Sequence, residues 1–330
     1  MACSEERPAK EAKGESTEGP NWLELPREVT TNILHKLGPF EILDSASLVC
    51  PLWWKICMDP LMWRTIDMTN PPLYPHDKLV RFCRRPIKRS CGHLEDISID
   101  DFCTNKILKD IANCGSHVRR MRLLKCEEMS DKGLIAVVKK LPILEEFEIS
   151  FGDVSKYTLE LTGKCCSHLK VLKFNKKEDK EYKCDDEAFA IAKTMPGLRH
   201  LQLLGNRLTD KGLLAILDGC PRLESLDLRV CSNVDLSGSL RERCCKQIRY
   251  LRFPEDLSDE VGIYVEDEDE YCELCGYDCG CGEGGGYVNC GRHNDELIDT
   301  LITLKDSNDP DDKAYEKTLL AQYYDSFEMV

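Results

Sequence analysis

The stretch LRHLQLLGNRLTDKGLLAILDGCP, residues 198–221, contains one complete unit of a repeating pattern. Leu198, Leu201 and Leu203 are separated by polar residues in the manner of a strand. In the second half, leucine and isoleucine recur at the three- and four-residue spacing of a helix with one apolar face. The stretch therefore predicts a strand, a turn and a helix.

The same unit recurs along the chain with the strand pattern L-x-x-L-x-L. Its copies begin at Leu94, Val118, Leu144, Leu169, Leu198, Leu223 and Ile248. The steps between them fall within the 20–29 residues of a leucine-rich repeat, in which a strand is followed by a helix. The sequence therefore predicts an α/β fold, a right-handed α/β horseshoe of about six to seven repeats over residues 94–253.

The ninth position of each unit faces the turn between strand and helix. Cys126, Asn206 and Cys231 occupy it in three units, so the repeats resemble the cysteine-containing class of leucine-rich repeat. Free cysteine is a small, commonly buried residue. We therefore expect a structural role for the cysteines at turns and helix ends, namely Cys126, Cys165, Cys166, Cys184, Cys220, Cys231, Cys244 and Cys245.

The segment before the repeats is rich in tryptophan. LPREVTTNILHKL (25–37) predicts a helix that begins at Pro26 and is stopped by Gly38-Pro39. A second helix is expected from Phe40 and a third from Pro51. Three short helices cannot enclose all of their apolar side chains, and an apolar surplus on a soluble module marks an interaction site. The alternative is that the segment packs on the rest of the same chain.

Residues 21–68 also resemble an F-box. The resemblance rests on Leu25-Pro26-Arg27-Glu28-Val29, Ile33-Leu34, Leu37, Val49-Cys50, Trp53 and Asp59-Pro60-Leu61-Met62-Trp63. It implies that the helices bind the Skp-type adaptor of an SCF ubiquitin ligase and, through it, a cullin. The adaptor-binding residues implied are Leu25, Pro26, Val29, Ile33, Leu34, Leu37, Val49, Trp53 and Trp63.

The whole layout is similar to that of plant Skp-interacting F-box/LRR proteins. The resemblance implies a non-catalytic subunit that recognises a protein client for ubiquitination. Two alternatives remain: an F-box/LRR scaffold that acts outside the ligase, and a zinc- or redox-responsive binding protein that acts through its cysteine-rich tail.

The remaining segments have distinct compositions. Residues 1–20 are charged and predict a disordered N-terminus without an apolar signal region. Residues 69–93 predict a linking helix whose basic residues form a solvated face, so we expect no nucleic-acid partner. No apolar run is long enough to span a membrane, and cysteine without a signal peptide is typical of a reducing compartment. We therefore expect a protein of the cytoplasm or nucleus.

Outward-facing residues of the predicted strands alternate in charge from one strand to the next, which predicts cross-strand ion pairs. The exception is a patch that comprises Lys170, Lys173, Arg199 and His200, where positive charge is expected to be uncancelled. Charge-patterned surfaces determine specificity more than affinity. We therefore expect this patch to bind the client.

Residues 254–330 form an acidic tail with 22 Asp and Glu against 4 Lys and Arg, and we expect it to be largely disordered. Cys272 and Cys275 have the C-x-x-C spacing that supplies half of a zinc site, and Cys290 with His293 could complete it. The high glycine content of this stretch argues against a zinc site. We expect no cofactor, with a zinc site in the tail as the alternative.

Overall fold

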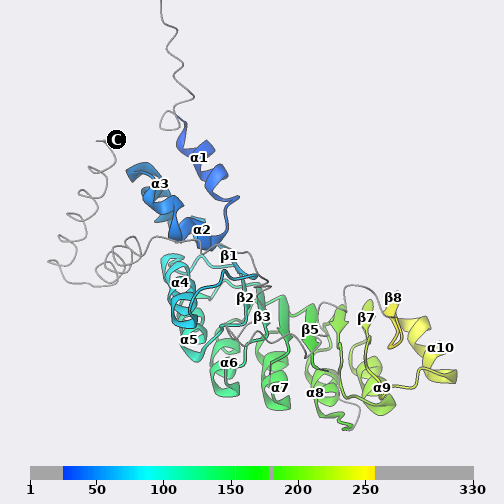
Figure 1. Cartoon of the computed structure of the whole chain (residues 1–330). Coiled ribbons are helices and arrows are strands. Elements are labelled where there is room, and N and C mark those ends of the chain that lie inside the picture. The colour runs from blue at the N-terminus through cyan, green and yellow to red at the C-terminus, as the bar shows by residue number, and fades with distance from the viewer. Residues whose placement is uncertain (1–24, 153, 178–181, 257–330) are drawn as a thin grey trace, which may run out of the picture.

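The computed structural model describes residues 25–152, 154–177 and 182–256. It contains a helical module followed by a solenoid in which one parallel sheet is covered on one face by a row of helices (Figure 1). We call the opposite face of the sheet the open face, because no helix of the described residues covers it (Figure 1). The predicted α/β solenoid is confirmed.

The sheet has eight parallel strands in chain order. They are β1 (Thr65–Met68), β2 (Asp96–Asp100), β3 (Arg120–Leu124), β4 (Glu146–Ser150), β5 (Val171–Asn175), β6 (His200–Gln202), β7 (Ser225–Asp227) and β8 (Tyr250–Arg252). The central apolar residue of each repeat pairs with the next one, as in Ile97 with Met121 and Leu201 with Leu226. The register of the leucine pattern therefore sets the register of the sheet.

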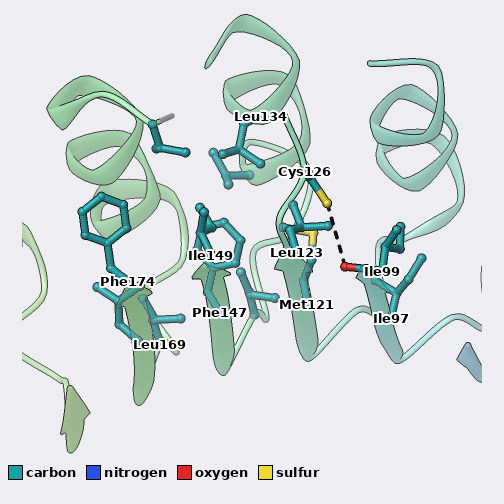
Figure 2. Packing of buried hydrophobic residues seen from close by; sticks show 14 of the residues in the cluster. Ile97, Ile99, Met121, Leu123, Cys126, Leu134, Phe147, Ile149, Leu169 and Phe174 are labelled. Atoms are coloured by element: carbon teal, nitrogen blue, oxygen red, sulfur yellow. Dashed lines mark hydrogen bonds between the residues drawn. The ribbon is translucent and has the colours of Figure 1, made fainter. Parts of the chain in front are cut away.

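The helices of the solenoid are α4 (His76–Arg89), α5 (Asn105–Cys114), α6 (Asp131–Val138), α7 (Lys156–Cys165), α8 (Asp186–Thr194), α9 (Asp210–Gly219) and α10 (Gly238–Gln247). Side chains from strands and helices meet in one continuous apolar interior (Figure 2). Leu123 and Ile149 of the strands and Leu134 of α6 are fully buried there. Among the described helices, none has both the length and the apolar character that crossing a membrane requires.

The ninth position of the repeat joins neighbouring repeats through a hydrogen bond. Asn206 Nδ2 donates to the carbonyl oxygen of Phe174 at 3.0 Å, and Cys231 Sγ donates to that of Leu203 at 2.7 Å. Cys126 Sγ makes a long contact of 3.9 Å to Ile99 (Figure 2) and donates to its own strand at Leu124, 2.9 Å. A buried carbonyl needs a donor, so Asn206 and Cys231 satisfy the carbonyls of the preceding repeats at these turns. Phe102, Gly152 and Lys177 occupy the ninth position in other repeats, so the hydrogen bond is not common to every turn.

Replacing Asn206 tests this role. We expect Asn206→Ala to lower the free energy of unfolding by about 1–3 kcal/mol, because the carbonyl of Phe174 would be left buried without a donor. Asn206→Cys should lose less than half as much, since cysteine serves the same position at Cys126 and Cys231. Urea unfolding of both variants is the measurement, and equal losses would contradict the assignment.

The helical module contains α1 (Arg27–Leu34), α2 (Pro39–Asp44), the 3-10 helix η2 (Ala46–Leu48), α3 (Pro51–Cys57) and the 3-10 helix η3 (Pro60–Trp63). Two of its helices begin at prolines that the sequence analysis placed at helix boundaries. Pro39 and Pro51 are the first residues of α2 and α3, where the missing proline N–H costs nothing. The carboxylate of Glu41 accepts from the backbone N–H of Gly38 at 2.9 Å and caps α2.

The parallel sheet begins earlier than the expected repeat boundary at residue 94. Strand β1 lies within the segment 21–68 and pairs with β2, so that Ile66 lies beside Ile97. Trp63, Ile66 and Met68 occupy the three apolar positions of a further repeat, and all three are buried. The end of the helical module is therefore also the first strand of the solenoid.

Helix α4 continues this junction. Tyr74 Oη donates to Asp44 Oδ2 of α2 at 2.6 Å, and the ring of Phe40 stacks on Phe82 of α4 with centroids 6.3 Å apart.

The prediction that the basic residues of α4 form a solvated face is wrong in part. Arg84 Nε donates to Asp110 Oδ2 of α5 at 2.6 Å, and Arg85 is buried over the ring of Phe82. Helix α4 is thus a packed member of the helix row.

Candidate functional site

The helical module presents large apolar side chains to solvent. Val29 on α1 is 42% exposed, Val49 before α3 is 57% exposed and Leu61 in η3 is 53% exposed. An ion pair between Arg27 and Asp59, 3.2 Å, joins the start of α1 to the start of η3 beside them. Exposed valine and leucine side chains on ordered helices offer a surface that another protein could cover.

The residues expected to bind the adaptor fall into three groups. Pro26, Val29 and Val49 are exposed. Leu25, Ile33, Leu37 and Trp53 are half-buried. Leu34 and Trp63 are buried at 0% and 1% exposure, so they offer almost no surface in this conformation, and their contact with an adaptor stays a prediction.

Trp63 is enclosed by its own chain. Its indole Nε1–H donates to the carbonyl oxygen of Cys57 at 2.9 Å, which satisfies the one polar group of the ring. Its side chain takes the place of the first leucine of a repeat, equivalent to Leu94. The alternative considered from the sequence, burial against the rest of the chain, therefore holds for this tryptophan.

The open face of the sheet carries the predicted cross-strand ion pairs. Glu145 accepts from Arg119 at 2.9 Å and from Lys170 at 2.8 Å. The buried carboxylate of Glu148 accepts from Arg122 at 3.0 Å and from Lys173 at 3.2 Å. The hydrogen bond from Lys170 is the main reason why the pKa of Glu145 lies below its ordinary value.

The prediction of uncancelled positive charge in the patch of Lys170, Lys173, Arg199 and His200 is therefore wrong for its lysines and its arginine. Lys170 and Lys173 pair with Glu145 and Glu148, and Arg199 pairs with Glu224 at 2.6 Å. Glu145 uses one oxygen for each partner, and Glu148 accepts from both of its partners through Oε2, so one acidic row binds the basic rows on both of its sides. Whether these residues bind a client stays a prediction.

A groove of about 550 Å³ lies on the open face across β5, β6, β7 and β8, and we call it the β5–β8 groove. It includes two residues of the expected client patch, Lys173 and His200. Its other polar lining residues are Gln202, Ser225, Asp227, Arg249, Tyr250 and Arg252. The sequence analysis did not single out Arg249 and Tyr250 as a site, although both occupy outward positions of the last repeat.

The described cysteines fit the structural role, with an exception. Cys126, Cys166, Cys220, Cys231 and Cys244 are buried, as expected, and Cys165 and Cys184 are half-buried. Cys245 is exposed, because it follows Cys244 on α10 and points away from the interior face. Its expected structural role is wrong.

Burial should govern thiol reactivity in this chain. Burial raises the pKa of the Cys166 thiol to about 12 and that of Cys220 to about 11, which leaves almost no thiolate at pH 8. We expect iodoacetamide to alkylate the exposed Cys91 and Cys245 at least tenfold faster than Cys166 and Cys220 in the folded chain. Mass spectrometry of timed samples measures this, with urea-unfolded protein as the control in which the difference disappears.

The proposed zinc ligands Cys272, Cys275, Cys290 and His293 lie outside the described residues. Within the part of the chain that the structure describes, no group of three or more His, Cys, Asp or Glu side chains is arranged to hold a metal ion. The zinc site in the tail stays a prediction.

Comparison with known proteins matches both parts of the chain. A family model described as F-box-like matches residues 22–69. The F-box protein SKIP19 of Arabidopsis thaliana is 48% identical over 274 residues, which cover 82% of this chain and 89% of that protein. Putative F-box/LRR-repeat protein 22 of the same organism is 41% identical over 74% of this chain and 80% of its own length. Putative F-box/LRR-repeat protein 23 is 44% identical over 72% of this chain and 54% of its own length.

Proposed function

Because the chain belongs to the plant family of F-box/LRR proteins, we propose that it is the substrate-recognition subunit of an SCF-type ubiquitin ligase. In this proposal the helical module binds a Skp-type adaptor, which connects the chain to a cullin, and the open face of the solenoid binds a protein client. The observation that carries the proposal is the exposed apolar surface of Val29, Val49 and Leu61 within the segment matched as F-box-like.

The proposed contribution to ubiquitin transfer is proximity. A client held on the solenoid would raise the effective concentration of its lysines near the conjugating enzyme, and this turns a bimolecular encounter into a local one. The side chains of this chain would bind and orient the client without forming or breaking a bond. We therefore propose a non-catalytic subunit that acts in the cytoplasm or nucleus.

Reconstitution tests the proposal directly. The full chain is co-expressed with a Skp-type adaptor, a cullin and a RING subunit, and the complex is analysed by size-exclusion chromatography. We expect one complex that contains all four proteins. A complex with the adaptor that excludes the cullin would favour a scaffold outside the ligase, and the absence of any adaptor complex would overturn the proposal.

A further inference from the structure

The β5–β8 groove is lined by the basic side chains of Lys173, His200, Arg249 and Arg252, and Asp227 is the carboxylate among its described lining residues. Lys173 already pairs with Glu148 at 3.2 Å. Asp227 is already neutralised, because Arg229 Nη2 donates to its Oδ2 at 2.7 Å and Arg229 Nε to its Oδ1 at 3.0 Å. The groove therefore has positive charge to offer to a ligand.

Two of these basic groups are available for an anion. Among the described residues, neither Arg249 nor His200 has a carboxylate within ion-pair distance, and both are exposed. The guanidinium of Arg249 lies 5.1 Å from the ring centre of Tyr250, which is itself 56% exposed. A stacked guanidinium keeps its N–H donors in its own plane, so it can still bind a carboxylate beside the ring.

The chain supplies a matching anion shortly after β8. Residues 266–270 read EDEDE, five consecutive carboxylates, and they follow Asp256, the last described residue, by ten positions. Ten residues can span up to about 33–36 Å. The groove crosses four strands, a width of about 14 Å at a strand spacing of about 4.8 Å. The acidic run can therefore reach any part of the groove.

We propose that the β5–β8 groove is a binding site for a run of carboxylates and that its resident occupant is the acidic segment Glu266–Glu270 of the same chain. A connection of ten residues gives the segment an effective concentration of the order of millimolar at the groove. Exposed ion pairs are individually weak, so the segment occupies the groove because it is attached. The regulatory part of this inference rests on the proposed function, because a client that binds in the groove must displace the segment.

The test uses the full chain and a labelled peptide. The peptide YVEDEDEY, residues 264–271, carries a fluorophore, and its binding is followed by fluorescence anisotropy. We expect the variant E266Q/D267N/E268Q/D269N/E270Q to bind the peptide at least tenfold more tightly than the wild-type chain, because its own segment no longer competes. Binding should weaken as the salt concentration rises, since the attraction is between exposed charges.

A matched pair of charge reversals locates the site. In the background of the neutralised segment, Arg249→Glu is expected to weaken peptide binding at least tenfold. Arg222→Glu makes the same charge change at an exposed residue of the loop after α9 and should have little effect. Equal peptide binding by the wild-type and neutralised chains, or equal effects of the two reversals, would overturn the inference.

Adaptor binding measured on the same variants separates this inference from the proposed function. All of them retain the helical module, so they should bind a Skp-type adaptor like the wild-type chain. Loss of adaptor binding by every chain, the wild type included, with the peptide results intact would remove the proposed function and leave the groove as a carboxylate site. The opposite pattern would remove the groove and leave the proposed function.

Discussion

Replacing Val29 and Val49 together by aspartate is expected to weaken binding to a Skp-type adaptor by about 100-fold or more. Fully burying a valine contributes about 1.5–3 kcal/mol, and Val29 and Val49 at 42% and 57% exposure together offer about one valine's worth of surface. Each 1.4 kcal/mol is a factor of ten in the dissociation constant, so the lost burial alone weakens binding by about 10- to 100-fold. Aspartate would also place a charge against an apolar partner surface. Isothermal titration calorimetry with the purified adaptor measures the loss.

The control for this pair changes exposed apolar residues away from the helical module. Tyr157 on α7 and Leu214 on α9 are 65% and 38% exposed, so Tyr157→Asp with Leu214→Asp adds the same charge. We expect the control to bind the adaptor as the wild type does. Both variants should keep the circular dichroism of the wild type, because both positions of each pair lie at the surface. A loss below threefold for the valine pair would show that the adaptor uses another surface.

Trp63→Ala is expected to destabilise the chain by about 3–5 kcal/mol, the range found when a buried tryptophan is removed from a core. Trp63 is 1% exposed, and its indole N–H satisfies the carbonyl of Cys57. The truncation would leave a cavity at the point where η3 runs into β1. Urea unfolding of the full chain measures the change.

A milder substitution separates packing from recognition. Trp63→Phe keeps most of the side-chain volume and loses the hydrogen bond to Cys57, so it should reduce stability less than Trp63→Ala. At a temperature where it remains folded, it should bind the adaptor as tightly as the wild type. Weaker adaptor binding by folded Trp63→Phe would show that Trp63 contributes directly to the adaptor-binding surface. Leu61→Ala, at a residue 53% exposed, is the stability control and should change the free energy of unfolding by less than about 0.5 kcal/mol.

The leucine pattern predicted most of the sheet because it is strictly periodic. Each central residue from Ile97 to Leu251 lies beside its counterpart in the neighbouring repeat. The first strand was missed because Trp63 stands at the first position, which is aliphatic in every other unit. In addition, the loop before α4 lengthens the step from Trp63 to Leu94 to 31 residues, beyond the expected range. A search that allowed tryptophan at the first position and a step of 31 residues would have found it.

The candidate sites were predicted less well, for reasons of geometry. The alternation of charge from strand to strand predicted the ion pairs correctly. Adding up the charges of each strand did not show that Glu145 and Glu148 would each bind two cations. The groove was missed as a unit because its residues come from four repeats, and only the register places His200, Ser225 and Tyr250 in one row. Periodicity predicts which side chains face outward, whereas the hollows between them depend on side-chain size and pairing.

The shared strand β1 has a consequence for the choice of lysine on a client. The helical module ends inside the sheet as β1, and Tyr74 donates to Asp44 of α2, so two contacts within the described residues hold its exposed apolar surface against the solenoid. In the proposed ligase, the fold would therefore fix the distance between the adaptor and the bound client. Ubiquitin would then reach only those client lysines that lie within that fixed distance of the conjugating enzyme.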